Sequence, residues 1–359
     1  MKRFSSIIKR ISRVLKRRCC RKPFDELTAI YNGKTYKDYW YETYGHTRGR
    51  LFATIKIKRE AQEAFIQGGF RPDEFHLYRL ENQSKGYRDC FMSQKRKDDY
   101  LISYYGPSFR DVLEILKDKY VFYTYLKDFF KRDVSYIKSE QDRLSFLSFC
   151  NQHSHFFAKL NKGSCGRGCR VYTLDNPEQA NAIFNELVGS GEWIVEEVIK
   201  QDAAISQFNS SSVNTIRFPS FKKNGVVKSV FPCLRFGRAG SIVDNAGQGG
   251  MFVSIDQNTG EIITDAIDEK GNVFVEHPDS KISFRGFHVP QWDSIIETVK
   301  NAHLALPDNQ VYVAFDLALS DKGWCIVEGN WGDWILQQAS LQKGLGNEFT
   351  SLLFGEWAD

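Results

Sequence analysis

The sequence lacks any uncharged apolar run that approaches the roughly 18–20 residues of a membrane-spanning helix, which excludes a helical span. It also lacks regular cysteine spacing. Of its eight cysteines, Cys19 and Cys20 are adjacent, and the others are scattered along the chain. Charges at positions 9, 10 and 13 interrupt the apolar run that a cleavable signal peptide needs. We therefore interpret the cysteines as reduced and predict a cytoplasmic protein.

Acidic residues are missing from the first 22 positions, which read MKRFSSIIKRISRVLKRRCCRK and carry ten Lys and Arg. The remaining chain has 39 basic and 44 acidic residues, so it is mildly acidic although the whole chain carries a formal charge of +5. General binding to nucleic acid depends on clustered positive charge that neutralises phosphates. We therefore expect no nucleic-acid partner.

Residues 1–22 form a basic arm that predicts an amphipathic helix. On a helical wheel, seven of the eight Lys and Arg up to position 18 lie opposite an arc of about 120° that holds the apolar residues Phe4, Ile7, Ile8, Ile11, Val14 and Leu15. A basic helix with one apolar stripe suits the surface of an anionic bilayer, here the inner face of the membrane. Two alternatives stay open, namely a helix packed on the protein's own body and a frayed basic tail.

A P-loop is missing as well, although residues 158–172, AKLNKGSCGRGCRVY, resemble one in part. Gly163 and Gly168 have the separation of the two P-loop glycines. However, Cys169 stands where the lysine of a P-loop is required, and the residues that follow predict a strand, not a helix. The sequence therefore does not predict a P-loop.

The same stretch predicts a glycine loop between two strands. A zinc site needs four ligands, usually in close pairs, and Cys165 and Cys169 stand alone. Small residues let backbone N–H groups approach phosphate oxygens, and Lys159 at the end of the first strand adds a positive charge. The alternative is a glycine-rich hairpin without a ligand.

The predicted secondary structure changes along the chain from helices to strands. Residues 23–118 predict mostly helices, and REAQEAFIQGGFRPDEF reads as a helix that Gly68 and Gly69 stop, with Pro72 soon after. From about residue 155 short β-rich runs follow, interrupted by two helical patterns. We predict the α+β class, with sheets built largely of adjacent hairpins. The predicted units are the arm 1–22, a helix-rich region 23–118, a smaller subdomain 119–200 and a C-terminal subdomain 201–359.

Two later strands carry acids among apolar residues, in VYVAFDLALSDKGWCIVEGNWGD. Glu328 and Asn330 are two apart on one strand and so point to one face, and a hairpin would bring Asp316 beside them. Two carboxylates and an amide oxygen suit Mg²⁺. The alternative is a row of solvent-facing polar positions on an edge hairpin, although acids bracketed by apolar residues need a partner if they are buried.

Taken in order, these segments resemble the ATP-grasp superfamily, most closely its sugar-transfer-associated branch, over roughly residues 109–345. DKYVFYTYLK is similar to the segment that offers a first nucleotide lysine, and FFAKLNKGSCGRG to the second lysine with its flexible glycine loop. IVEEVI resembles the strand that reads adenine, and VAFDLAL with IVEGN the metal motif. The resemblance implies an ATP-grasp fold, in which two α+β subdomains grip ATP, with ATP and Mg²⁺ as cofactors.

The resemblance also implies roles for individual residues. The nucleotide-binding residues would be Lys119, Lys159, Gly163, Ser164, Gly166, Gly168, Glu196, Glu197, Val198, Ile199 and Asp202, with Gln201 as the alternative to Asp202 at the ribose. The metal ligands would be Asp316, Glu328 and Asn330. SVNTIRF and RFGRAGSIVDNAGQGG look like signatures of this branch, and they place substrate-binding roles on Asn214, Asn245 and Gly249.

The sequence departs from the family pattern at one position. Many ligases of this fold carry an arginine two residues before the first metal aspartate, where this chain has Ala314. The charge of the reaction intermediate would then be met by another arginine. The candidate catalytic residues are Arg217, Arg235 and Arg238.

The implied reaction is the ATP-dependent joining of a small-molecule carboxylate to an amine through an acylphosphate. The setting of this branch implies surface polysaccharide or sugar modification, with an amino acid and a sugar as the substrates. One alternative is a kinase on the same fold that phosphorylates a hydroxyl, which would not release free phosphate. A second is a nucleotide-binding scaffold for glycosyl transfer machinery, against which the intact metal motif argues.

Overall fold

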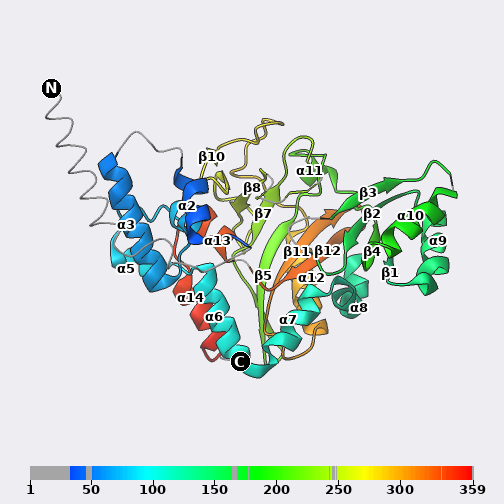
Figure 1. Ribbon diagram of the computed structural model, residues 1–359, viewed down its shortest axis with the longest axis horizontal. Helices are drawn as coiled ribbons and strands as arrows, with labels where there is room; N and C mark the ends of the chain where they lie inside the picture. Colours follow the sequence, from blue (N-terminus) through cyan, green and yellow to red (C-terminus); the bar gives the residue numbers. More distant parts are fainter. Residues whose placement is uncertain are drawn as a thin grey trace.

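The structure is a computed structural model that describes residues 33–45, 51–163, 168–176, 178–241, 243–244, 247, 249–332 and 334–357, with the backbone alone at 51–54. Helices of the N-terminal part, a large sheet and a smaller sheet follow one another across Figure 1. The basic arm 1–22 lies outside the described residues, so its predicted membrane contact stays a prediction. None of the described helices is long and apolar enough to cross a membrane.

The N-terminal part is helical, as predicted. Its described elements are α2 (Tyr36–Tyr44), α3 (Leu51–Gly68), α4 (Pro72–Leu77), α5 (Lys85–Asp89), α6 (Gln94–Tyr105), the 3₁₀ helix η2 (Gly106–Ser108) and α7 (Phe109–Lys117). Helix α3 ends at Gly68, and Gly69 takes the left-handed φ of +72° that ends a helix readily. Pro72 then begins α4, because its missing N–H has no partner in a first turn.

The smaller sheet is fully antiparallel. Its order is β1 (Val134–Ile137), β4 (Trp193–Glu197), β2 (His155–Leu160) and β3 (Arg170–Thr173). The 3₁₀ helix η3 (Glu140–Asp142) and the helices α9 (Arg143–Gln152) and α10 (Glu178–Val188) accompany it. Phe146 and Phe184 of these helices pack on Phe156 and Val195 of the strands, so one face of the sheet forms a core. Because side chains alternate along a strand, the neighbouring positions point away from this core.

The large sheet has the strand order β10-β9-β8-β7-β5-β11-β12, and β6 pairs with β5 beside this path. All its described pairings are antiparallel. The bounds are β5 (Ile216–Lys223), β6 (Val226–Ser229), β7 (Cys233–Phe236), β8 (Met251–Ser254), β9 (Ala266–Asp268), β10 (Val273–Phe274), β11 (Tyr312–Ser320) and β12 (Gly323–Asn330). Strand β11 lies between β5 and β12 and is buried along its whole length.

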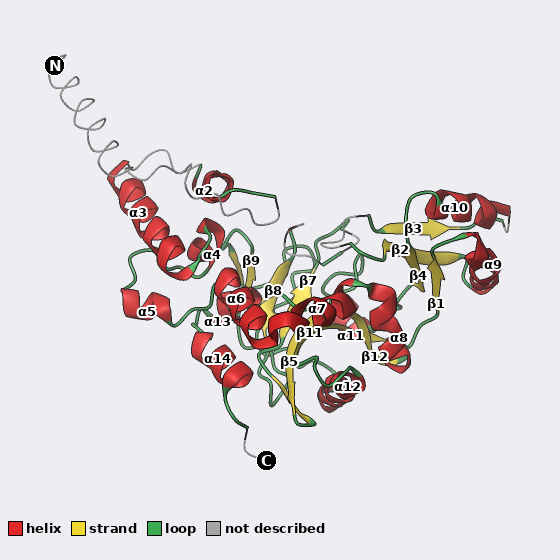
Figure 2. Cartoon of the chain, turned by 60° about the horizontal axis from the view of Figure 1, so that its bottom comes forward, coloured by secondary structure: helices red, strands yellow, loops and turns green. Residues whose placement is uncertain are grey.

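Both faces of the large sheet are covered, by different parts of the chain (Figure 2). Leu234 and Val253 face the core with α8 (Lys119–Phe130) and α12 (Trp292–Ala305), whereas the alternate residues Cys233 and Phe252 face the N-terminal helices. The remaining helices are α11 (Ala203–Ser206), α13 (Ile335–Leu341) and α14 (Gly346–Phe354). The sheets and helices together confirm the α+β class with a helix-rich N-terminal region.

Within the predicted unit 119–200, the packing is divided. Helix α8 packs with Phe122, Leu126 and Phe130 into the core of the large sheet, whereas β1–β4 form the smaller sheet. The chain returns from β4 to the large sheet through residues 198–202. There the N–H of Asp202 donates to the Leu319 carbonyl at 2.9 Å. The end of β4 is thus attached beside the end of β11.

Candidate functional site

The side chains of Asp316, Glu328 and Asn330 come together on adjacent strands. Strands β11 and β12 pair Asp316 with Glu328, and a bulge beyond this pair leaves Val327 without a partner in the strand register. The Asn330 amide nitrogen lies 3.3 Å from an Asp316 oxygen and 3.4 Å from a Glu328 oxygen. The predicted hairpin therefore does place the two carboxylates and the amide at one point.

Two arginines hold the Asp316 carboxylate from the other side. Arg217 of β5 binds both carboxylate oxygens, one through Nε and the other through Nη2 at 2.8 Å. Arg235 of β7 adds a hydrogen bond of 2.9 Å. Burial favours the neutral acid, but the two guanidiniums outweigh it and hold the pKa of Asp316 below its ordinary value. Asp316 is therefore ionised at neutral pH, and the two arginines fix the orientation of its carboxylate.

These residues fit a magnesium ion by the chemistry of their donor atoms. The nitrogen and oxygen of an amide are distinguished only by the hydrogen-bond network, so a half-turn of the Asn330 side chain would present Oδ1 instead of Nδ2. Asp316 Oδ2 already accepts hydrogen bonds from Arg217, Arg235 and Asn330, so the carboxylate oxygens that would bind a cation are Asp316 Oδ1 and those of Glu328. Two carboxylates and an amide oxygen are hard ligands of the kind that Mg²⁺ takes while it keeps some of its waters.

Lys159 and Glu196 lie on the face of the smaller sheet that points away from its helices. Lys159 Nζ is 2.6 Å from Glu196 Oε1 and 3.4 Å from the Val327 carbonyl, next to Glu328. Arg132 pairs with the other Glu196 oxygen at 2.8 Å and donates to the Ile326 carbonyl at 2.7 Å. Burial opposes ionisation of Glu196, yet Arg132 and Lys159 hold its pKa below the ordinary value. The smaller sheet is thereby tied to β12 beside the candidate metal ligands.

Lys119 is the first residue of α8 and meets the glycine loop. Its ammonium donates to the Gly163 carbonyl at 2.6 Å and to the Asn161 carbonyl at 3.3 Å. Burial lowers the pKa of Lys119, and nearby Glu328 opposes this shift while Lys159 adds to it. Lys119, Lys159 and Glu328 therefore belong to one electrostatic cluster, which joins the predicted phosphate lysines to the predicted metal ligands.

The glycine loop joins β2 to β3 as a hairpin, as predicted. Gly168 has a φ of +81°, and a Cβ there would come within 2.9 Å of the Leu160 side chain, so the position favours glycine. Ser164 and Gly166 lie outside the described residues. Burial raises the pKa of the Cys169 thiol, which makes it a weak ligand and nucleophile. Phosphate binding by this loop stays a prediction.

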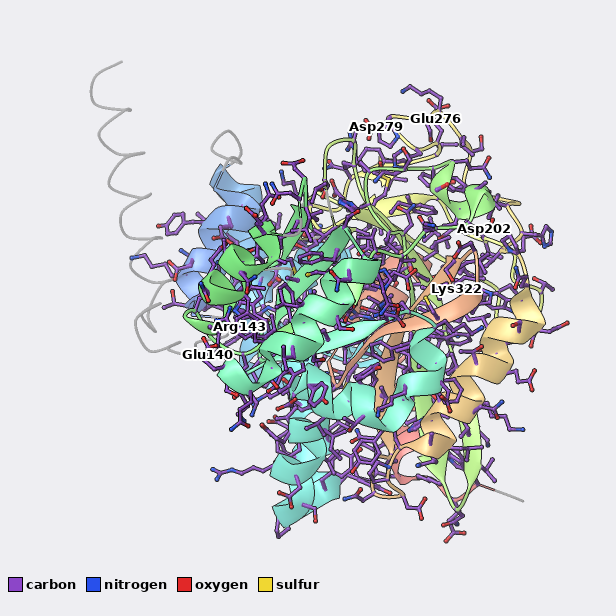
Figure 3. The ribbon with its side chains drawn as sticks, turned by 90° about the vertical axis from the view of Figure 1, so that its right-hand side faces the viewer. Glu140, Arg143, Asp202, Glu276, Asp279 and Lys322 are labelled. Atoms are coloured by element: carbon purple, nitrogen blue, oxygen red, sulfur yellow. The ribbon has the colours of Figure 1, made fainter. Side chains whose placement is uncertain are left out.

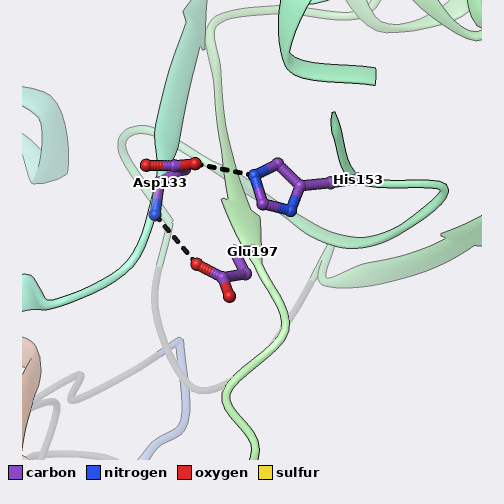
Figure 4. Close-up of side chains that lie close together, drawn as sticks. All are labelled: Asp133, His153 and Glu197. Carbon is purple, nitrogen blue, oxygen red and sulfur yellow. Dashed lines mark hydrogen bonds and ion pairs between the residues drawn. The ribbon is translucent and has the colours of Figure 1, made fainter. Parts of the chain in front are cut away.

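The predicted adenine strand ends at Glu197, and the half-buried Val198 and Ile199 follow it. The Glu197 carboxylate is held by Lys322 at 2.9 Å and by the N–H of Asp133 at 3.2 Å. Figure 4 shows this end of the strand, where His153 Nε2 lies 2.8 Å from the Asp133 carboxylate. The contacts of Glu197 with the Asp133 N–H and with Lys322 therefore fasten the end of β4 to the start of β1 and to the turn between β11 and β12.

Asp202 and Lys322 lie on the same flank of the molecule in Figure 3. Asp202 caps α11, since its Oδ1 accepts from the Ala204 N–H at 2.8 Å. Its predicted contact with a ribose stays a prediction. The neighbouring Gln201 binds the Asn214 carbonyl at 2.7 Å and forms an isolated bridge with Ser320.

The predicted substrate residues have unlike surroundings. Asn214 is buried and its amide binds Gln201 and the Asn209 carbonyl, at 3.0 and 2.8 Å, so its described contacts are within the protein. Gly249 has a φ of +89° with open space around its Cα, and Asn245 lies outside the described residues. Their substrate-binding roles stay predictions.

Of the three candidate arginines, the structure brings two to Asp316. Arg217 and Arg235 bind it directly, whereas Arg238 pairs with Asp279 at 3.2 Å. Asp279 lies in a peripheral loop, near the edge of the view in Figure 3. Which arginine would stabilise an intermediate stays a prediction, but Arg238 lacks the contact with Asp316 that the other two make.

Sequence reasoning missed two charged residues of this region. Arg132 follows α8 in the run KRD, where nothing in the spacing marks it as the partner of Glu196. Asp244 lies inside RFGRAGSIVDNAGQGG, where nothing in the spacing marks it as a partner of Thr215 and Arg235. The signal that could have found both is burial of a charge, which only the tertiary structure reveals.

Comparison with solved structures gives matches of low similarity. D-alanyl-alanine synthetase A from Vibrio cholerae is 12% identical, with a TM-score of 0.40, over 67% of this chain and 64% of that one. VanG D-Ala:D-Ser ligase from Enterococcus faecalis is 11% identical, with a TM-score of 0.42, over 67% and 61%. The ATP-grasp ligase PsnB complexed with a minimal precursor is 9% identical, with a TM-score of 0.41, over 68% and 63%. The chain spans less than two thirds of the length of these proteins.

A search of curated proteins finds no match. The family described as sugar-transfer associated ATP-grasp matches residues 95–351, well over half of the chain. This match confirms the predicted fold and extends the resemblance, which began at about residue 109, to include α6. The chain therefore belongs to the sugar-transfer-associated ATP-grasp family.

Proposed function

We propose that this protein is an ATP- and Mg²⁺-dependent ligase that joins a carboxylate to an amine in the modification of sugars or surface polysaccharide. The observation that carries the proposal is the convergence of Asp316, Glu328 and Asn330 beside Lys159 and Lys119. Acidic oxygens for a cation and ammonium groups for phosphates are the parts that phosphoryl transfer requires. The family description supplies the link to sugars.

The proposed reaction has two steps. A carboxylate oxygen of the first substrate attacks the γ-phosphorus of ATP, the bond to the β-phosphate oxygen breaks, and ADP leaves. The amine of the second substrate then attacks the acyl carbon, releases phosphate and loses a proton, which forms the amide. This sequence needs no nucleophilic side chain from the protein, so the protein's part is to position the reactants and to neutralise charge.

The residues of this chain would divide that work. Asp316, Glu328 and Asn330 would hold Mg²⁺, which supplies positive charge to the phosphates when it is bound. Lys159 and Lys119 would neutralise phosphate oxygens from the smaller sheet and from α8. Arg217 and Arg235 keep Asp316 ionised and correctly aimed, as their contacts with its carboxylate indicate.

The test is a screen of the purified protein with ATP and Mg²⁺, in which amino acids are crossed with amino sugars and uronic acids. A ligase would release ADP and free phosphate together, and only when both cosubstrates are present. ADP without free phosphate, with a phosphorylated sugar, would show a kinase instead. Nucleotide binding without turnover of any pair would favour the scaffold. Glu328→Gln serves as the inactive control for contaminating ATPase.

A further inference from the structure

Asp244 is a buried carboxylate for which the sequence predicts no role. Its Oδ2 accepts two hydrogen bonds from Thr215, one from the backbone N–H at 2.9 Å and one from the hydroxyl at 2.6 Å. Its Oδ1 lies 3.4 Å from the guanidinium of Arg235. Thr215 directly precedes β5, so Asp244 fastens a loop to the start of the strand that carries Arg217.

The hydroxyl of Thr215 connects Asp244 with Arg235. Because this hydroxyl donates a hydrogen bond to Asp244, its oxygen lone pairs are free to accept. Arg235 donates to this oxygen through both Nε, at 3.1 Å, and Nη2. The same Nη2 donates to Asp316 at 2.9 Å. A continuous chain of contacts therefore leads from Asp244 through Thr215 and Arg235 to the first candidate metal ligand.

Arg235 is also shared between two carboxylates, Asp244 and Asp316. Removing the Asp244 charge would release the guanidinium from one side and leave its full positive charge on Asp316. A more positive surrounding disfavours a divalent cation at Asp316, Glu328 and Asn330. Loss of the Asp244 charge would thus weaken cation binding in two ways. It would release Arg235, which orients Asp316, and it would make the surroundings of the site more positive.

We propose that Asp244 is a positioning residue of the magnesium site, which acts on Asp316 through Thr215 and Arg235. This inference rests on the proposed function. It adds a residue of the segment RFGRAGSIVDNAGQGG, Asp244, which is connected to Asp316 through Thr215 and Arg235. A loop anchor without this role would affect stability but would leave the magnesium dependence of nucleotide binding unchanged.

The experiment measures binding of ADP by titration calorimetry at a series of Mg²⁺ concentrations, together with the thermal unfolding midpoint of each ligand-free variant. Asp244→Asn removes the charge with little change of shape, and Thr215→Val removes the hydroxyl but keeps the charge. Thr215→Ser restores the hydroxyl. The matched control is Asp265→Asn, which removes a carboxylate paired on the surface with Arg285.

In Asp244→Asn and Thr215→Val, we expect the Mg²⁺ concentration for half-maximal ADP binding to rise about tenfold, the factor that corresponds to about 1.4 kcal/mol. Thr215→Ser and Asp265→Asn should stay within about twofold of the wild type, a difference of about 0.4 kcal/mol by the same conversion. If Asp244→Asn does not fold, Thr215→Val against Thr215→Ser decides the matter, since Thr215→Val lacks the hydroxyl that Thr215→Ser keeps.

A folded Asp244→Asn or Thr215→Val that binds like the wild type would overturn the inference and leave the proposed function standing. A wild-type protein that shows no Mg²⁺-dependent binding of ADP would overturn the proposed function and this inference with it. The two failures are distinguished by the wild-type titration alone.

Discussion

Asp316 lies directly opposite Arg217 on the neighbouring strand β5, and its two carboxylate oxygens bind Nε and Nη2 of that one guanidinium. The pair is buried, and Arg235 adds a second positive charge to it. A candidate metal ligand therefore also serves as the counter-charge of two buried arginines. Glu328, by contrast, is half-buried, and the Asn330 amide nitrogen lies 3.4 Å from its carboxylate.

This difference predicts unlike effects of two isosteric substitutions. Asp316→Asn removes the carboxylate that both arginines bind and leaves Arg235 with Asp244, and loss of one partner from a buried pair costs about 3–5 kcal/mol. We expect it to lower the free energy of unfolding by about that amount and to abolish turnover. Glu328→Gln should abolish turnover as well, because several kcal/mol of transition-state stabilisation would be lost, but it should leave stability within about 1 kcal/mol of the wild type.

Urea unfolding and ADP release measure the two effects separately. An Asp316→Asn protein as stable as the wild type would contradict the charge argument. A near-normal kcat of Glu328→Gln at saturating Mg²⁺ would contradict the metal assignment.

Lys159 has a predicted role at the phosphates that differs from its contact with Glu196. Lys159→Ala should keep the fold, because Arg132 continues to neutralise Glu196. It should raise the KM for ATP and lower turnover, since a charge-assisted phosphate contact is worth on the order of 1.5–3 kcal/mol. Steady-state kinetics with ATP as the varied substrate measure both effects.

The cysteines of the glycine loop provide the control. Cys165→Ser and Cys169→Ser should have mild effects, because the loop is proposed to bind phosphate through its backbone. If both serine variants lose activity while Lys159→Ala retains it, the loop is a cysteine site and the phosphate assignment is wrong.

How far the sequence predicts this structure depends on how local each signal is. The helix that stops at Gly68 and the hairpin that pairs Asp316 with Glu328 follow from spacing of a few residues, and both agree with the structure. Strand β1 was not predicted, because VSYI is short and its partner β4 lies far along the chain. Local sequence patterns do not show which distant segments of the chain pair as strands.

The candidate site shows the same limit. Glu328 and Asn330 share a face because they are two apart, which a sequence can show. The contact of Arg132 with Glu196, and that of Asp244 with Thr215, join residues from separate segments. Such charges are placed by the packing of whole elements, so their partners could not be predicted from spacing.

Stability should fall in mild acid, because of a buried histidine. His303 of α12 lies between the Ser220 hydroxyl and the Gln310 carbonyl, at 2.7 and 2.8 Å, and burial lowers its pKa to about 3 from an ordinary value of 6.5. Below the ordinary pKa the unfolded chain binds a proton that the folded chain does not bind. The free energy of unfolding should therefore decrease from about pH 6.5 towards pH 3, by up to about 1.4 kcal/mol per pH unit for this group.

Urea unfolding at several pH values between 7 and 4 checks this slope. His303→Gln keeps a donor for the Gln310 carbonyl but cannot take up a proton, so its unfolding free energy should depend less on pH. His155→Gln, at an exposed position, is the matched control and should keep the wild-type slope. An unchanged slope in His303→Gln would assign the acid sensitivity to other groups.

The basic arm predicts attachment to anionic membrane. Deleting residues 1–22 should spare turnover of soluble substrates but weaken co-sedimentation with vesicles of anionic lipid, since the rest of the chain is mildly acidic. The effect should be larger at low salt, because the Debye length shrinks from about 30 Å at 0.01 M to about 8 Å at 0.15 M. Replacing Ile7, Ile8 and Ile11 with serine keeps the charge and should weaken binding too, which separates insertion of the apolar stripe from simple attraction. Equal pelleting of the full-length and truncated proteins would instead favour an arm that packs on the protein or extends as a basic tail.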